Sequence, residues 1–226
     1  TPDPGGCEGR GGLMRGCLSR GEVLLIAACA LATASAALGL RELHLLFKPL
    51  AMLIALALTW RMPHAPWPRL ALLGSLAGDV FLMLPGLFMP GLVAFLLAHI
   101  AYTVRLRQDA PWFASRRALL ATLAVGAAMY AFLWWGGLPA TLRMPVAAYV
   151  VVIALMAAQA LGRASVLGDR ASLWVAVGAG CFMLSDALLA VNRFVTPLPM
   201  AQLAVLASYY AAQYLIVGGL IRSRPA

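Results

Sequence analysis

Two aspartates, Asp79 and Asp186, lie inside apolar stretches, residues 78–84 and 185–191, that resemble each other. An ionised side chain at the centre of a bilayer costs about 3 kcal/mol, so a carboxylate in an apolar helix usually faces a partner, water or a substrate. Two buried carboxylates in one site can be held in different protonation states, one as a proton donor and the other as a base. We therefore expect the function at these two residues, and acid and base catalysis is the chemistry that they favour.

Structural and transport roles would also account for Asp79 and Asp186. Either carboxylate could form a hydrogen bond between helices or an ion pair with Lys48, the only lysine in the chain. Proton or ion transport would use the same side chains, because carboxylates inside membrane proteins often relay protons. These alternatives stay open at the level of the sequence.

The elements that would position these residues are eight apolar runs, each close to the roughly 20 residues that a helix needs to cross a bilayer. Of the 226 residues, 63% are hydrophobic and 11% charged, which indicates an integral membrane protein. The runs cover residues 22–40, 43–60, 70–85, 91–106, 115–135, 144–161, 171–191 and 200–221. We therefore predict an all-α fold, a polytopic bundle of eight transmembrane helices forming one membrane domain over residues 21–226. Residues 1–20 we expect to be disordered or foreign to the natural protein.

The arginines indicate how the bundle is oriented, because short cytoplasmic loops of membrane proteins are enriched in Lys and Arg. With the N-terminus inside, all arginines fall in cytoplasmic segments except Arg41, Arg143 and Arg193. We therefore expect both termini in the cytoplasm, and the plasma (inner) membrane as the location if the source is bacterial. The net charge of +9 follows from this topology. No basic polar surface remains for nucleic acid, which excludes that class of partner.

Polar residues of several predicted helices fall at similar depth. Asp79 and Asp186 lie in the third and seventh runs, which point the same way, and each run is followed by a helix with polar or aromatic residues. This offset suggests a four-plus-four parallel repeat. At 1.5 Å per residue, most of these polar residues lie about 10 Å from the outer ends of their helices. The sequence thus predicts a polar pocket in the outer half of the bundle.

Six further residues are candidates to bind a substrate: Lys48, His99, Tyr102, Asn192, Tyr209 and Gln213. The Lys48 ammonium could neutralise an aspartate, bind a lipid phosphate or extend to the membrane surface. His99 could orient a carboxylate or bond a neighbouring helix, and Asn192 could instead end its helix. Because His44 and His64 are predicted at opposite membrane edges and the cysteines form no C-x-x-C pair, we expect no metal site.

Short motifs in five of the predicted helices resemble the YhhN-like lysoplasmalogenase family of multi-pass membrane proteins. The motifs are Lys48-Pro49-Leu50, residues 78–83, 98–102 and 182–194, and Tyr209-Tyr210-Ala211-Ala212-Gln213. The resemblance runs from about the second to the eighth helix, although the fifth and sixth carry no signature. It implies hydrolysis of the vinyl ether bond of lysoplasmalogens, which are lysophospholipids with an alkenyl chain, to a fatty aldehyde and a glycerophospho-alcohol.

The chemistry of the aspartates is compatible with that reaction. A vinyl ether hydrolyses when an acid protonates its β-carbon to give an oxocarbenium ion, to which water then adds. We expect Asp186, near Tyr209, to donate the proton and Asp79 to stabilise the cation and activate water, although the reverse assignment stays open. Lys48 is the candidate for the phosphate, the lysophospholipid would enter from the bilayer among other membrane lipids, and no cofactor is required. The alternative is a proton-coupled transporter of a small solute or lipid, for which only Lys48-Pro49 offers a helix break.

Overall fold

The computed structural model describes residues 19–62 and 66–223, and the regular structure in these residues is entirely helical. The predicted all-α fold is confirmed, and each predicted run corresponds to one helix. The eight helices are α1 (Arg20–Ala37), α2 (Arg41–Leu58), α3 (Pro66–Met83), α4 (Phe88–Arg107), α5 (Arg116–Trp135), α6 (Arg143–Leu167), α7 (Arg170–Phe194) and α8 (Ala201–Arg222), with short 3-10 turns at Thr59–Arg61 and Ala140–Leu142.

Residues 1–20 were predicted to be a disordered segment, and all of them except the last two lie outside the described residues. His64 also lies outside the described residues. Arg20 is already the first residue of α1, and Ser19 is its N-cap. Ser19 caps α1 because its hydroxyl accepts a hydrogen bond from the Glu22 N–H, while the Glu22 carboxylate accepts one from the Ser19 N–H. This reciprocal capping box fixes the start of α1 one residue before the predicted domain boundary.

Within the described residues, six helices are long and apolar enough to cross a membrane, namely α1, α4, α5, α6, α7 and α8. The chain is therefore an integral multi-pass membrane protein. The other two helices do not reach this level: α2 holds the charged residues Arg41, Glu42 and Lys48, while α3 holds Arg69 and Asp79. The helices with the weakest membrane signal are thus those that carry Lys48 and Asp79.

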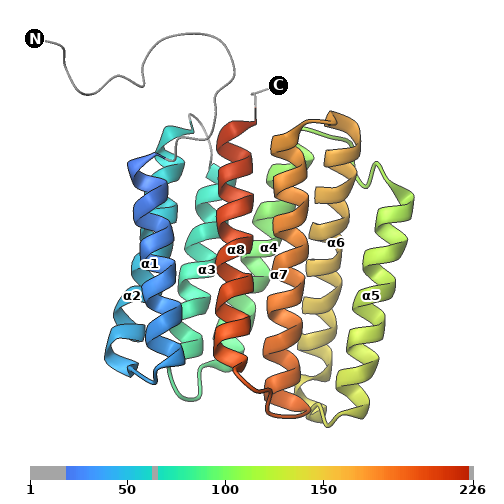
Figure 1. Ribbon diagram of the computed structural model, residues 1–226. Helices are drawn as coiled ribbons and strands as arrows, with labels where there is room; N and C mark the ends of the chain where they lie inside the picture. Colours follow the sequence, from blue (N-terminus) through green and yellow to red (C-terminus); the bar gives the residue numbers. More distant parts are fainter. Residues whose placement is uncertain (1–18, 63–65, 224–226) are drawn as a thin grey trace, which may run out of the picture.

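The helices stand side by side in one bundle (Figure 1). Consecutive helices pack as pairs, α4 and α6 meet in the interior, and α5 lies at one edge with α6 as its main partner. The turns after α1, α3, α5 and α7 gather at the lower end of Figure 1, which we call the cavity end. The start of α1 and the end of α8 lie at the opposite end, as an even number of antiparallel helices requires.

Glycines bring two helix pairs close together. A Cβ atom at Gly78 in α3 would lie 2.5 Å from the Phe95 ring of α4, and one at Gly219 in α8 would lie 2.7 Å from the Ala171 carbonyl of α7. Small residues at such crossings allow the close approach on which helix packing in membranes depends. Because Gly78 precedes Asp79, its tight contact with α4 also fixes the rotation of α3 that directs Asp79 into the bundle.

Helix starts differ between the two ends of the bundle. Away from the cavity end, the side chains of Ser19, Ser115 and Asp169 cap α1, α5 and α7. At the cavity end, the residues that precede α2, α4, α6 and α8 make no side-chain cap, and they are Leu40, Leu87, Leu142 and Met200. The first N–H groups of these four helices consequently lack the usual side-chain acceptor at the cap position.

Candidate functional site

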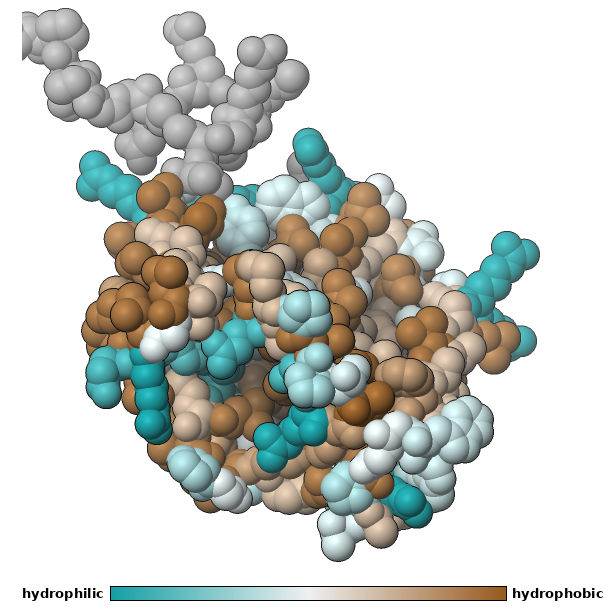
Figure 2. All heavy atoms as spheres, turned by 60° about the horizontal axis from the view of Figure 1, so that its bottom comes forward, coloured by the Kyte–Doolittle hydropathy of each residue, from teal (hydrophilic) through white to brown (hydrophobic). Residues whose placement is uncertain are grey.

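A cavity of about 500 Å³ opens at the cavity end, lined mainly by residues of α2, α3, α7 and α8. Figure 2 shows the hollow on this face, with hydrophilic residues around it. Both aspartates line this cavity, which we call the polar cavity, together with Lys48, Asn192 and Tyr209. The structure therefore brings five of the eight predicted site residues to one hollow.

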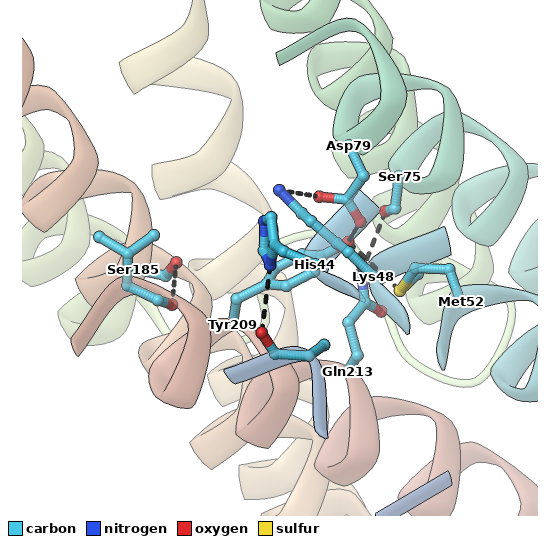
Figure 3. A network of polar contacts seen from close by, with 10 residues as sticks. His44, Lys48, Met52, Ser75, Asp79, Ser185, Tyr209 and Gln213 are labelled. Atoms are coloured by element: carbon cyan, nitrogen blue, oxygen red, sulfur yellow. Dashed lines mark hydrogen bonds and ion pairs between the residues drawn. The ribbon is translucent and has the colours of Figure 1, made fainter. Parts of the chain in front are cut away.

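Asp79 lies at the inner end of the polar cavity, bonded to two neighbouring helices (Figure 3). Its Oδ1 lies 3.1 Å from the Lys48 Nζ of α2, and its Oδ2 accepts a 2.7 Å hydrogen bond from the Tyr209 hydroxyl of α8. The Asp79 side chain is only 2% exposed. A carboxylate this deeply buried needs such a counter-ion and hydrogen-bond donor, because an unpaired buried charge is strongly destabilising.

Gln213 and Tyr102 lie behind this ion pair. They line neither the polar cavity nor the second cavity of the bundle, which is described below. The Gln213 amide donates to the Ser75 hydroxyl at 3.1 Å and to the Tyr209 oxygen at 3.4 Å, and it accepts a 2.7 Å bond from the Tyr102 hydroxyl. These bonds fix the position of the Tyr209 ring. Gln213 and Tyr102 therefore support Tyr209 and do not border the space open to a ligand.

Asp186 has different partners, which come from α6 and α4. The Tyr149 hydroxyl donates a 2.6 Å hydrogen bond to Asp186 Oδ2, and His99 Nε2 lies 3.9 Å from the same oxygen. His99 is fully buried, packs edge-on against Tyr149 and Phe182, and neither ring nitrogen has a hydrogen-bond partner among the described residues. No lysine or arginine of the described chain pairs with Asp186, so its environment lacks the fixed cation that Asp79 has.

Asp186 was predicted near Tyr209, and both residues line the polar cavity, but the Tyr209 hydroxyl is bonded to Asp79 and not to Asp186. The face of α7 that meets α8 belongs to Ser185, whose hydroxyl donates to the Val205 carbonyl at 3.0 Å. Consecutive residues of a helix point about 100° apart, so Asp186 turns toward α6 and α4 instead.

Tyr149 is the site residue that the sequence reasoning missed, since α6 carries no family motif. A signal was nevertheless present. Tyr149 is the only tyrosine of α6, and it lies six residues after the helix start. At 1.5 Å per residue, that puts it at a depth of about 9 Å, in the same layer as the aspartates.

A second cavity of about 500 Å³ lies between α4, α5, α6 and α7, and its lining is almost entirely apolar. We call it the apolar cavity. Asp186, Leu82, Phe95 and Leu189 line both cavities, whereas Asp79 lines only the polar one. Asp186 thus lies where a polar and an apolar compartment meet, which suits an amphiphilic ligand whose reactive bond joins a polar part to a hydrocarbon chain.

Asn192 does not end its helix, because α7 continues to Phe194. Its side-chain oxygen accepts a 2.9 Å hydrogen bond from the Leu198 N–H and so holds the turn between α7 and α8. Asn192 also lines the polar cavity. In the part of the chain that the structure describes, no three His, Cys, Asp or Glu side chains gather into a group that could hold a metal ion.

The site can support proton transfer and charge stabilisation. One carboxylate has a fixed counter-ion, and the other has a phenol and an imidazole and borders an apolar space. Pairs of carboxylates in unlike surroundings are the usual arrangement for an acid and a base that act together.

Comparison with known proteins identifies a family that this chain matches. The model of the YhhN family matches residues 43–220, which include the eight predicted site residues and Tyr149. Human lysoplasmalogenase TMEM86B (Homo sapiens) is 33% identical over 182 residues, covering 79% of this chain and 75% of the human protein. The pig protein of that name (Sus scrofa) is 38% identical over 148 residues, covering 65% of this chain and 59% of the pig protein.

A bacterial relative extends beyond this chain. The lysoplasmalogenase of Mycobacterium bovis is 33% identical over 165 residues, which cover 70% of this chain and 61% of the mycobacterial protein. This chain therefore spans less than two thirds of the length of that relative. No solved structure matches the chain.

Proposed function

The chain belongs to the YhhN family, and on that premise we propose that it hydrolyses the vinyl ether bond of a lysoplasmalogen, releasing a fatty aldehyde and a glycerophospho-alcohol. One observation carries the proposal: Asp186 borders both the polar and the apolar cavity. A lysoplasmalogen has its vinyl ether between a phosphoglycerol head and a hydrocarbon chain. With the head in the polar cavity and the chain in the apolar one, that bond would lie at Asp186.

In the proposed mechanism, the Asp186 carboxyl group donates its proton to the β-carbon of the vinyl ether. The α-carbon becomes an oxocarbenium ion, and the Asp79 carboxylate stabilises this positive charge across the polar cavity. Water adds to the α-carbon and loses a proton to a carboxylate. The resulting hemiacetal then breaks into the aldehyde and the alcohol, so that one water molecule is consumed in each turnover.

The partners of the two aspartates support this division of roles. The Lys48 ammonium at 3.1 Å and the Tyr209 hydroxyl at 2.7 Å both favour an ionised Asp79. Asp186 lacks such a cation and borders the apolar cavity, where a charge without a counter-ion is poorly solvated. The Tyr149 hydroxyl at 2.6 Å would orient Asp186 and stabilise the negative charge left after proton transfer. Lys48, Tyr149 and Tyr209 would thus act as positioning residues.

We further propose that α2 and α3 cross the membrane beside the six apolar helices, giving one domain of eight crossings with both termini in the cytoplasm. Lys48 and Asp79 form an ion pair inside the bundle, which lowers the free-energy cost of placing α2 and α3 in a bilayer. In this orientation the cavity end faces away from the cytoplasm, and the substrate would enter from the bilayer.

Transport is the less favoured alternative. A helix break at the site would favour transport and was expected only at Lys48-Pro49, but α2 runs through Pro49 from Arg41 to Leu58. The similar proteins described above are also named as enzymes.

Aldehyde release from purified protein tests the proposal. Wild-type protein is expected to release fatty aldehyde from alkenyl-lysophosphoethanolamine and not from the alkyl or acyl analogues, because only the vinyl ether gives a stabilised cation on protonation. Asp186→Asn, checked for folding by its thermal transition in detergent, is expected to release aldehyde about 10³-fold more slowly. A folded wild type that releases no aldehyde with any head group would contradict hydrolysis, and proton-coupled flux in liposomes would then be measured.

A further inference from the structure

Three nitrogen-bearing side chains lie along one face of α2. Arg41, His44 and Lys48 are spaced by three and four residues, which aligns them on a helix, and all three line the polar cavity. Lys48 lies at the inner end, beside Asp79, and Arg41 is the first residue of the helix, at the rim. Seven residues of helix separate the two cations by about 10 Å.

The outer part of this row lacks an anionic partner. The Lys48 charge is matched by Asp79, but Arg41 forms no ion pair or side-chain hydrogen bond with any described residue. His44 Nδ1 lies 3.1 Å from the Ala32 carbonyl, so this nitrogen carries the proton and the ring is held against α1 with Nε2 available. An unpaired guanidinium that lines a cavity attracts an anion, and its planar fork of donors matches phosphate oxygens.

The backbone adds to the positive potential at the rim. Both α2 and α8 begin there, and their preceding residues, Leu40 and Met200, make no side-chain cap. Ala201 and Gln202, the first two residues of α8, line the same cavity as Arg41. The Arg41 and Ala201 N–H groups already donate to the Gly39 and Leu198 carbonyls, but the start of a helix still carries a partial positive charge that favours an anion.

We propose that Arg41, with His44, forms the subsite for the phosphate of the lysophospholipid at the rim of the polar cavity. This inference rests on the proposed function and deepens it. With the vinyl ether at Asp186, the glycerol unit spans the polar cavity and the phosphodiester reaches the rim. The phosphate-binding role predicted for Lys48 thereby passes to Arg41, because the Lys48 ammonium is paired with Asp79.

Substrates with and without a phosphate test this subsite. We expect Arg41→Gln to lower kcat/KM for alkenyl-lysophosphoethanolamine, mainly through KM, relative to kcat/KM for 1-alkenylglycerol. The ratio of kcat/KM for alkenyl-lysophosphoethanolamine to kcat/KM for 1-alkenylglycerol is expected to fall by about 10-fold or more, since a charge-assisted hydrogen bond to the phosphate is lost. Arg143→Gln is the matched control, because Arg143 is also the first residue of a helix at the cavity end, yet it stacks on Trp134 and lines neither cavity. An unchanged ratio in Arg41→Gln, or an equal fall in both variants, would overturn the subsite.

A binding measurement separates this inference from the hydrolysis itself. Alkyl-lysophosphoethanolamine has no vinyl ether, so its affinity for wild type and Arg41→Gln can be measured without turnover. Weaker binding to Arg41→Gln supports the subsite even if wild type releases no aldehyde, and equal binding overturns it even if wild type is active. Glycerophosphoethanolamine is expected to compete with the bound lipid, and competition by inorganic phosphate alone at the same concentration would overturn the assignment to a lipid headgroup.

Discussion

Asp79 and Asp186 are the same residue type in similar apolar stretches of the sequence, yet in the folded bundle they have different partners. Asp79 is bonded to a cation and a phenol and borders only the polar cavity. Asp186 is bonded to a phenol, approaches an imidazole and borders both cavities. The difference shows that the chemistry of a buried carboxylate is set by the helices around it rather than by its own motif.

The positions of these partners correspond between the two halves of the chain. Asp79 receives Lys48 from the second helix and Tyr209 from the eighth. Asp186 receives Tyr149 from the sixth helix and is approached by His99 of the fourth. Each carboxylate on the third helix of one half thus meets the second helix of its own half and the fourth of the other. A four-plus-four repeat would give this pattern, and the repeat itself stays a prediction.

The largest expected effect comes from removing the proton of Asp186. Asp186→Asn should lower kcat for aldehyde release by about 10³-fold, within the range for loss of a general acid. Stability should change little, because the Asn side-chain oxygen can still accept the Tyr149 hydroxyl. Rates and thermal transitions of the purified variant measure both quantities. A fully active Asp186→Asn protein would remove Asp186 from the acid role and reverse the comparison.

Substitution of Asp79, unlike that of Asp186, should lower the free energy of unfolding strongly. Asp79→Asn leaves the Lys48 charge buried without a counter-ion, which costs about 3 kcal/mol of unfolding free energy. Adding Lys48→Met removes that charge and should restore most of the stability while activity stays low. Unfolding in detergent and aldehyde release, measured on both variants, check this. If the double variant regains activity, the Asp79 charge is dispensable and the ion pair is purely structural.

The sequence predicted the helices and the depth of the polar residues, but not which of them meet. Apolar runs near 20 residues and a constant rise per residue determine both length and depth. Partners depend also on the rotation of each helix about its axis, which contacts such as that of Gly78 with Phe95 set. The prediction could therefore place Asp186 near Tyr209 but could not show that Tyr209 bonds Asp79 and that Ser185 occupies the face toward α8.

The shape and lining of the two cavities could not be predicted from the sequence either. The apolar cavity is lined by residues of five helices whose types alone would suggest ordinary packing or contact with lipid. Arg41 did stand out, as an exception to the arginine distribution, but only its place at the rim of the polar cavity supports the proposed phosphate subsite.

A smaller effect is expected from the two phenols that donate to the aspartates. Tyr149→Phe should lower kcat by about 30-fold, because it removes a hydrogen bond to the carboxyl group that gains negative charge in the reaction. Tyr209→Phe should lower it less, since Lys48 still neutralises Asp79. Steady-state kinetics of the two folded variants give the comparison. A larger loss in Tyr209→Phe would indicate that Asp79, and not Asp186, is the acid.

The smallest effect tests whether Asp186 truly separates a head compartment from a chain compartment. Gly180 of α7 lines the apolar cavity, and a Cβ atom there would meet nothing within 4 Å. Gly180→Leu should therefore fill part of the cavity and displace the end of a long alkenyl chain. Each displaced methylene would cost about 0.8 kcal/mol, or about fourfold in kcat/KM for long chains relative to short ones.

Val177→Leu is the matched control for Gly180→Leu, because Val177 lies on the same helix, is half exposed and lines neither cavity. Chain-length preference should change in Gly180→Leu alone, while preference among head groups should stay the same in both variants. If Gly180→Leu altered head-group preference instead, the two cavities would act as one. Asp186 would then no longer differ from Asp79 by its position at a boundary, and only the Lys48 ion pair would distinguish the two carboxylates.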